Sequence, residues 1–175
     1  MGDTMKQKTY LITKNKFLDD TEISGLLKSL SYDRDGLLIR LAILTGARAS
    51  EILNIHTKDL STNSVIIHGL KNSDDREIPL PPDFVQKLKA QSSRYKVFDI
   101  GYQRLNQIWQ KYRPNKKTFH ALRHTYAMQI YKQTKDLLLV QQALGHRSIN
   151  NTTVYAKASN GQEQLKTAMI GLWLK

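Results

Sequence analysis

The sequence predicts a mainly α-helical fold with a small antiparallel β-sheet, in the α+β class. Apolar residues recur at helical spacing through most of the chain. Residues 63–82 differ, because two short β-rich runs there flank a polar turn. A length of 175 residues with 40% hydrophobic content suits one domain with a sizeable core.

Glycines, prolines and capping residues divide the helical patterns. The expected helices cover residues 17–31, 33–46, 49–60, 82–91, 101–112, 118–134 and 136–144. Asp20 or Thr21 is expected to cap the first helix, and Asp136 the last. Gly46 and Gly145 are expected to end the second and the last, since glycine readily takes the left-handed conformation at a helix C-terminus.

The β-rich runs, residues 63–70 and 76–82, predict a hairpin around the turn-forming cluster 71–75. Residues 95–100 suggest a third strand. Further along, Ser148 is expected to cap a short helix that leads to Tyr155.

We expect three segments along the chain. Residues 1–17 form a basic leader or linker, residues 18–160 the folded domain, and residues 161–175 a C-terminal tail helix. The tail has an apolar stripe, which suits packing either on a neighbouring subunit or on its own domain.

The charge is the most informative part of the composition. Twenty-seven Lys and Arg against fifteen Asp and Glu give a net charge of +12. Because the basic residues are spread along the chain, we expect a folded basic surface that binds a polyanion such as nucleic acid. The plain alternative is a charged surface that only keeps the protein in solution. Cysteine is absent, which excludes disulfides and thiolate metal sites. No apolar run is long enough for a transmembrane helix, so no membrane partner is expected.

His120, Arg123 and His124 occupy one face of the expected helix 118–134. A zinc site is one reading of two histidines four residues apart, but Ala121 replaces the glutamate of a zinc protease and Arg123 would place a cation beside the metal. A phosphate site uses both side-chain types, because guanidinium grips two oxygens while imidazole moves protons. A solvated arginine and a satisfied histidine are the plain alternative.

Two basic residues upstream fit the phosphate reading. Arg48 follows the expected helix end at Gly46, where it can point at a ligand. The plain alternative is a surface ion pair with Glu51. In a third interpretation, Glu51 orients Arg48 toward the ligand. Lys71 opens the hairpin turn, where a lysine either protonates a leaving oxygen or protects a sheet edge.

His146 and Tyr155 complete the candidate set. His146 leaves its helix at the sharp turn after Gly145. Small polar residues surround Tyr155 in the sequence, whereas a core tyrosine usually has apolar neighbours. A packing role is the plain alternative, since the chain has eight tyrosines and most tyrosines pack.

Together these residues match metal-free cleavage of a phosphodiester. Cations stabilise the charge that builds on the phosphate oxygens, and a phenol with a pKa of about 10 becomes a nucleophile only near positive charge. No phosphate-binding loop and no acidic metal cluster is recognisable, so neither a cofactor nor a metal is expected.

The chain resembles the tyrosine recombinases, the phage-integrase-type site-specific recombinases. Four blocks carry the resemblance: TGARASEI, GLKNSDDREIPL, TFHALRHTYA and LGHRSINNTTVYA. It implies the family's catalytic-domain fold over residues 18–160. It also implies a role for each of six residues: Arg48 and Arg123 bind the scissile phosphate, Lys71 protonates the departing 5′ oxygen, His120 assists proton transfer at the tyrosine, His146 hydrogen-bonds the phosphate, and Tyr155 forms a 3′-phosphotyrosine link.

The resemblance further implies a DNA strand transferase that acts on double-stranded DNA as a homotetramer in the synaptic complex, in the nucleoid or in a host cytoplasm. The tail from residue 161 would exchange between subunits. Two alternatives stay open: a type IB topoisomerase and a non-catalytic DNA-binding regulator.

Only 17 residues precede the domain, whereas most family members carry a DNA-clamping domain there, so we expect either a catalytic fragment or a short enzyme like the fimbrial inversion recombinases.

Overall fold

The structure is a computed structural model, and it describes residues 16–70 and 73–158. Its helices are α1 (Asp20–Ser29), α2 (Arg34–Thr45), α3 (Ala49–Leu53), α4 (Pro82–Gln91), α5 (Tyr102–Tyr112), α6 (His120–Thr134), α7 (Leu137–Leu144) and α8 (Thr153–Ala158). Two short 3₁₀ helices are η2 (Thr57–Asp59) and η3 (Ile149–Asn151). The strands are β1 (Ser64–Ile67) and β2 (Arg76–Pro79).

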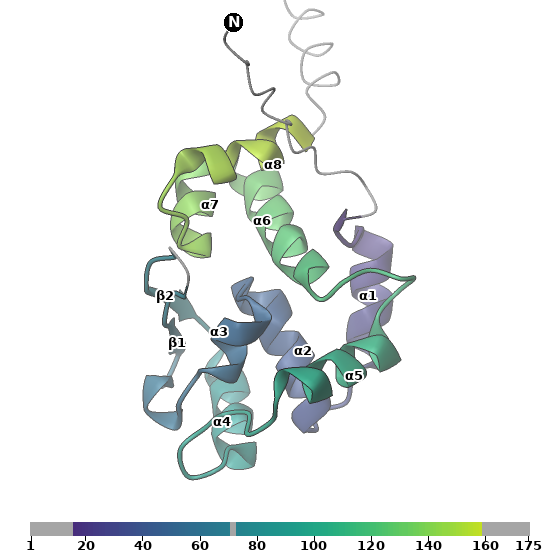
Figure 1. Cartoon of the computed structure of the whole chain (residues 1–175), viewed down its shortest axis with the longest axis vertical. Coiled ribbons are helices and arrows are strands. Elements are labelled where there is room, and N and C mark those ends of the chain that lie inside the picture. Colours follow the sequence, from purple (N-terminus) through teal and green to yellow (C-terminus); the bar gives the residue numbers. More distant parts are fainter. Residues whose placement is uncertain (1–15, 71–72, 159–175) are drawn as a thin grey trace, which may run out of the picture.

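The predicted α+β class is confirmed. β1 and β2 pair antiparallel, with Ser64 opposite Pro79 and Ile67 opposite Arg76. The hairpin lies at the edge of a helical body, and α6 runs from that body to a smaller group formed with α7 and α8 (Figure 1). None of the described helices is both long and apolar enough to cross a membrane.

Local capping signals fix the ends of several helices. Asp33 and Asp136 accept backbone N–H bonds at the starts of α2 and α7, the second as predicted. The predicted cap of α1 is wrong: Asp19 caps it, because Glu22 bonds back to the Asp19 N–H in a reciprocal capping box.

Gly46 and Gly145 end α2 and α7 as predicted, with φ of 59° and 66°. A Cβ on Gly46 would lie 2.3 Å from the Tyr126 ring. One on Gly145 would lie 2.6 Å from the Asp74 carbonyl oxygen. Both positions therefore need glycine for space as well as for conformation.

Two further sequence predictions differ from the structure. The helix expected over 49–60 ends at Leu53, because the chain after it turns to bond with residues 95–97. Those bonds form one isolated bridge between His56 and Lys96, so residues 95–100 are not a third strand of the sheet. Residues 1–15 and the predicted tail 161–175 lie outside the described residues.

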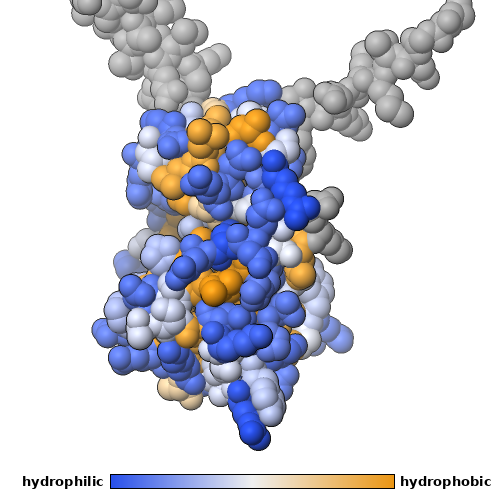
Figure 2. All heavy atoms as spheres, turned by 90° about the vertical axis from the view of Figure 1, so that its left-hand side faces the viewer, coloured by the Kyte–Doolittle hydropathy of each residue, from blue (hydrophilic) through white to orange (hydrophobic). Residues whose placement is uncertain are grey.

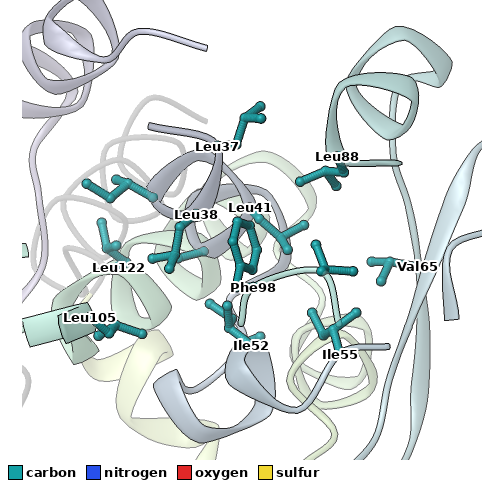
Figure 3. Close-up of a cluster of buried hydrophobic side chains, with 14 of the residues drawn as sticks. Leu37, Leu38, Leu41, Ile52, Ile55, Val65, Leu88, Phe98, Leu105 and Leu122 are labelled. Carbon is teal, nitrogen blue, oxygen red and sulfur yellow. The ribbon is translucent and has the colours of Figure 1, made fainter. Parts of the chain in front are cut away.

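The main core surrounds α2. Leu38, Leu41 and Ala42 of α2 are fully buried. Side chains from α3, α4, α5, α6 and β1 converge on them (Figure 3). A second, smaller cluster joins α6, α7 and α8 and consists of Ala127, Val140, Leu144 and Tyr155. The end of α2, the start of α3, the first half of α6 and the end of α7 meet between the two cores.

A core truncation measures how far the domain depends on α2. Leu38→Ala should lower the free energy of unfolding by about 2–5 kcal/mol, because it removes a fully buried side chain and leaves a cavity. Leu44→Ala, on the same helix but 38% exposed, should cost less than about 1.5 kcal/mol. Urea unfolding with an unchanged m-value measures both. Equal losses would contradict the assignment of α2 as the centre of the core.

Candidate active site

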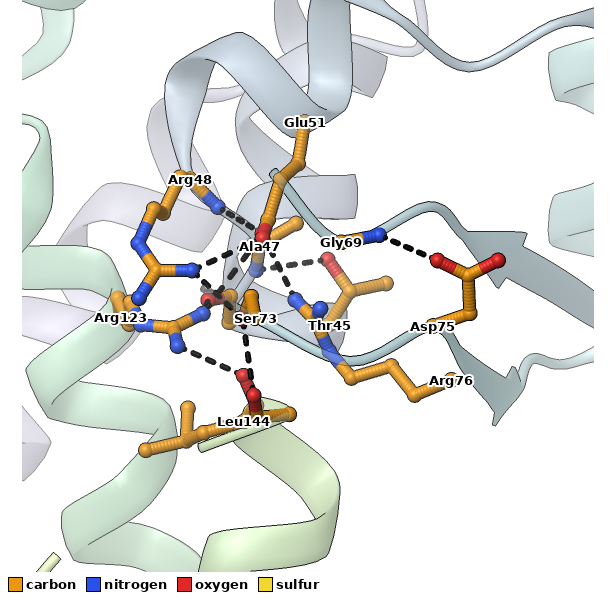
Figure 4. Close-up of polar contacts among 12 residues, drawn as sticks. Thr45, Ala47, Arg48, Glu51, Gly69, Ser73, Asp75, Arg76, Arg123 and Leu144 are labelled. Atoms are coloured by element: carbon orange, nitrogen blue, oxygen red, sulfur yellow. Dashed lines mark hydrogen bonds and ion pairs between the residues drawn. The ribbon is translucent and has the colours of Figure 1, made fainter. Parts of the chain in front are cut away.

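A buried carboxylate, Glu51, lies at the centre of the candidate site. Its side chain is inaccessible to solvent. Arg48 donates from Nη1 to Oε1 over 2.9 Å, and Arg76 donates from Nη2 to Oε2 over 2.8 Å. Nη1 of Arg123 lies 3.7 Å from Oε2. Figure 4 shows the three guanidinium groups approaching this one carboxylate. Glu51 therefore holds arginines from α3, β2 and α6 in one place.

Arg48 is the residue that precedes α3, directly after the turn at Gly46 and Ala47. Its own N–H bonds to Glu51 Oε2 over 2.8 Å, and its Nη1 also donates to Ser73 Oγ over 2.9 Å. The side chain keeps 30% of its surface exposed, whereas Glu51 has none. The interpretation as a surface Arg48–Glu51 pair is therefore wrong. Glu51 is buried and orients the partly exposed Arg48 side chain from inside the protein.

Arg123 is almost completely buried, with 2% exposed. Nη1 donates to the Gly46 carbonyl over 2.8 Å and Nη2 to the Leu144 carbonyl over 2.7 Å. Both carbonyls are at helix C-termini, where backbone acceptors lack partners within the helix. Burial first, and then the charges of Arg48 and Arg76, lower the Arg123 pKa to about 10.

The arginine cluster carries an excess of positive charge. Among the residues that the structure describes, Glu51 is the one carboxylate that ion pairs join to Arg48, Arg76 or Arg123. Burying like charges together is costly unless an anion compensates them. The cluster is therefore suited to an anion that carries one or two negative charges, such as a phosphate group.

The histidines near the cluster are held neutral. His120 is open to solvent on one side and has a lowered pKa through partial desolvation and the charges of Arg123 and Arg48. Its ring meets His124 edge to face, with the centroids 4.7 Å apart. His120 and Arg48 line the same cleft, together with Tyr102 and Asn106 of α5.

His146 follows Gly145 and is half-buried. Its Nδ1 lies 3.0 Å from Oγ1 of Thr152, a residue with no exposed surface. Burial and the charges of Arg123, Arg48 and Arg76 lower the His146 pKa to about 4. At neutral pH the ring is therefore uncharged, and its contact with Thr152 fixes the orientation of the ring.

Tyr155 lies in α8 and is only 2% exposed. Its ring packs in the smaller apolar cluster with Ala127, Val140 and Leu144. The packing role that stayed open for Tyr155 is therefore observed, and its apolar contacts come from α6 and α7 rather than from its sequence neighbours. The hydroxyl lies 3.1 Å from Nδ1 of His124.

The structure brings Arg48, His120, Arg123, His146 and Tyr155 into one region, whereas Lys71 lies outside the described residues. Three contributors were missed from the sequence: Arg76, Ser73 and Thr152. The alternation of β2 could have predicted that Arg76 is buried, since it shares the inward face of the strand with Ile78. Within residues 16–70 and 73–158, side chains of His, Asp and Glu form no group of three that could hold a metal ion.

Comparisons with known proteins give one family. The family described as "Phage integrase family" matches residues 16–162. The tyrosine recombinase XerA of Saccharolobus solfataricus is 30% identical over 150 residues, which cover 80% of this chain and 51% of that protein. XerH of Campylobacter jejuni is 30% identical over 171 residues, covering 86% of this chain and 48% of XerH. The chain spans about half the length of these curated relatives.

Solved structures show the same fold. The catalytic domain of bacteriophage HP1 integrase is 25% identical, with a TM-score of 0.66 over 86% of this chain and 93% of that one. A pre-cleavage complex of XerH with its difH substrate is also 25% identical, with a TM-score of 0.65 over 81% of this chain and 50% of XerH.

The lowered histidine pKa values predict how stability depends on pH. Burial and the charges of His120 and Arg123 lower the His124 pKa to about 3, against about 6.5 in an unfolded chain. Between these values the unfolded state binds a proton that the native state does not, so stability falls as pH falls. His124→Asn should reduce the slope of unfolding free energy against pH by about 1.4 kcal/mol per pH unit.

Urea unfolding of both proteins between pH 4.5 and 6 measures this slope. His68→Asn is the matched comparison, because the hydrogen bonds that His68 donates to the Asp75 and Asp59 carboxylates raise the His68 pKa. His68 contributes stability that is complete below about pH 6.5 and is lost as pH rises through its folded pKa. Its replacement should therefore leave the acid slope nearly unchanged. An unchanged slope in His124→Asn would mean that His124 is charged in the native protein.

Proposed function

The chain belongs to the phage integrase family, and from this premise we propose that it is a site-specific DNA recombinase. It cleaves and rejoins DNA strands through a covalent 3′-phosphotyrosine intermediate. The observation that carries the proposal is the cluster of Arg48, Arg76 and Arg123 on one buried carboxylate, next to the packed Tyr155. Such a cluster stabilises the charge that develops on a phosphodiester when a phenolic oxygen attacks it.

Arg48 and Arg123 bind the non-bridging oxygens of the scissile phosphate in this proposal. The exposed part of Arg48 supplies the first contact, and His146 donates a hydrogen bond to a phosphate oxygen. Its low pKa suits this role, since a neutral imidazole with one ring nitrogen at Thr152 presents the other to a ligand. Arg76 remains below the site, where it balances the charge of Glu51.

The cleavage step is a transesterification, so no nucleotide or metal has to supply energy. The Tyr155 oxygen forms a bond to phosphorus while the bond from phosphorus to the 5′ oxygen breaks. His120 assists removal of the phenol proton, and Lys71 gives a proton to the 5′ oxygen. Rejoining reverses both transfers, with the 5′ hydroxyl as the nucleophile.

Tyr155 has to change its environment before it can attack. A side chain that is 2% exposed offers its hydroxyl to no DNA strand. α8 has six residues and follows the 3₁₀ turn η3, so few helical bonds hold it in place. We propose that DNA binding moves α8 and turns the hydroxyl from His124 toward the phosphate.

Double-stranded DNA is the proposed partner. The net charge of +12 favours a polyanion, and the matched XerH structure holds its difH substrate. The cleft beside Arg48 and His120 gives room for the nucleotides next to the scissile phosphate. DNA as a substrate places the protein with the nucleoid, or in the host cytoplasm if it comes from a virus or a mobile element.

A homo-oligomer on DNA, a tetramer in the synaptic complex, is also part of the proposal. Strand β2 and helices α6 and α7 border a groove. Leu138 and Leu139 of α7 line it and are 64% and 41% exposed. Hydrophobic residues gather on the upper part of this face (Figure 2). The apolar stripe of residues 161–175 gives a neighbouring subunit a segment suited to such a groove.

Loss of the nucleophile tests the mechanism. Wild-type protein incubated with nicked cognate DNA in EDTA should form a protein–DNA adduct that survives denaturant. Tyr155→Phe should form none, because the phenyl ring keeps the packing but lacks the attacking oxygen. Gel electrophoresis in denaturant measures the adduct.

The same experiment separates the alternatives. An adduct in Tyr155→Phe would remove Tyr155 from its role. Relaxation of supercoiled DNA by a monomer without site preference would indicate a type IB topoisomerase. Binding to cognate DNA without an adduct on any substrate would indicate a non-catalytic regulator.

Arg48 allows the phosphate site to be tested without removing the buried Arg123. Arg48→Gln should slow adduct formation by about 10²–10³-fold, because a donor aimed at the developing charge is lost. DNA affinity should fall far less, since many phosphate contacts share the binding. Single-turnover cleavage and fluorescence anisotropy measure the two effects. Arg34→Gln, an exposed arginine on α2, is the control for a lost positive charge. Equal losses of affinity and cleavage rate would make Arg48 a binding contact only.

A further inference from the structure

The hydroxyl of Ser73 joins three parts of the candidate site. It accepts a hydrogen bond from Arg48 Nη1 over 2.9 Å and donates one to the Gly145 carbonyl over 3.0 Å. Ser73 is buried, with 4% exposed, and lies at the C-terminal end of the hairpin turn. It therefore connects the residue that precedes α3 with the turn that presents His146.

The chemistry of the groups fixes the direction of both bonds. A guanidinium group only donates and a carbonyl only accepts, so the single hydroxyl proton has to point to Gly145. Nη1 of Arg48 then uses its two protons on Glu51 and Ser73. Among the described residues, none bonds to the edge formed by Nε and Nη2, and this edge suits a two-pronged contact with a phosphate. Figure 4 shows how Glu51 and Ser73 flank this guanidinium group.

The backbone at Ser73 is held independently of its hydroxyl. The Asp74 N–H donates to the Gly145 carbonyl over 3.0 Å, and Ser73 pairs with His146 in an isolated bridge. Gly69 approaches the Ser73 carbonyl so closely that a Cβ there would lie 2.1 Å away. Removal of the hydroxyl should therefore leave the turn in place and release mainly the Arg48 side chain.

We propose that Ser73 is a positioning residue for strand cleavage, acting through Arg48. It sets the guanidinium edge of Arg48 at a fixed place relative to His146, so that both reach the same phosphate. The inference rests on the proposed recombinase function. A hydrogen bond to a charged group that sets catalytic geometry is worth roughly a factor of ten or more in rate.

Ser73→Ala tests the proposal in the full chain. It should slow single-turnover adduct formation on nicked cognate DNA about tenfold and change DNA affinity less than about twofold. Ser64→Ala is the matched control: Ser64 is also buried in the hairpin, with 5% exposed, and its hydroxyl bonds to Glu77 at the far end. This control should keep the wild-type cleavage rate.

A double-mutant cycle separates positioning from a general structural role. In an Arg48→Gln background, Ser73→Ala should cause no further slowing, because the side chain that it positions is already absent. A tenfold loss in both backgrounds would overturn the proposal, as would a wild-type rate in Ser73→Ala. If Ser73→Ala fails to fold, Ser73→Cys keeps the size with weaker hydrogen bonds, and its rate should lie between those of wild type and Arg48→Gln. An adduct absent even from wild type would refute the proposed function rather than the role of Ser73.

Discussion

One buried carboxylate has to satisfy several guanidinium groups, and the site depends on this constraint. Arg48 and Arg76 bond to Glu51 and stabilise its charged form, and the charge of Glu51 in turn helps to order both arginines. Hydrogen bonds from Arg76 and from the Arg48 backbone, with the nearby positive charges, outweigh desolvation and keep the Glu51 pKa lowered. The positive charge that remains is held before any ligand arrives, so an arriving phosphate meets prepared donors.

Tyr155, the proposed nucleophile, is held mainly by apolar packing. Tyr155 packs among apolar side chains of α6 and α7, and its hydroxyl meets a histidine that is neutral at physiological pH. α6 belongs to both arrangements, because Arg123 faces the arginine cluster while Ala127, one turn later, faces the apolar cluster. A small shift of α8 against α6 would therefore change the exposure of Tyr155 without disturbing the arginines.

The sequence predicted the helix ends well where short local patterns determine them. Gly46, Gly145 and Asp136 act on neighbouring backbone groups, so their helix ends follow from short patterns. Errors arose where distant segments decide: residues 95–97 bond to residues 55–57, and Tyr155 is buried by helices from earlier in the chain. Arg48, His120, Arg123, His146 and Tyr155 lie in one region, and their catalytic roles stay a prediction. Arg76 and Ser73 were missed because their partners lie 25 residues away.

Arg123 has a second role that follows from its two carbonyl partners. By bonding to Gly46 and Leu144 it ties the C-termini of α2 and α7 together from inside the protein. A related chain that had lost all strand-cleaving chemistry would still need this arginine to fold. Its presence in a distant sequence is therefore weak support for catalysis, whereas an arginine like the partly exposed Arg48 is a more reliable marker when searching genomes for working enzymes.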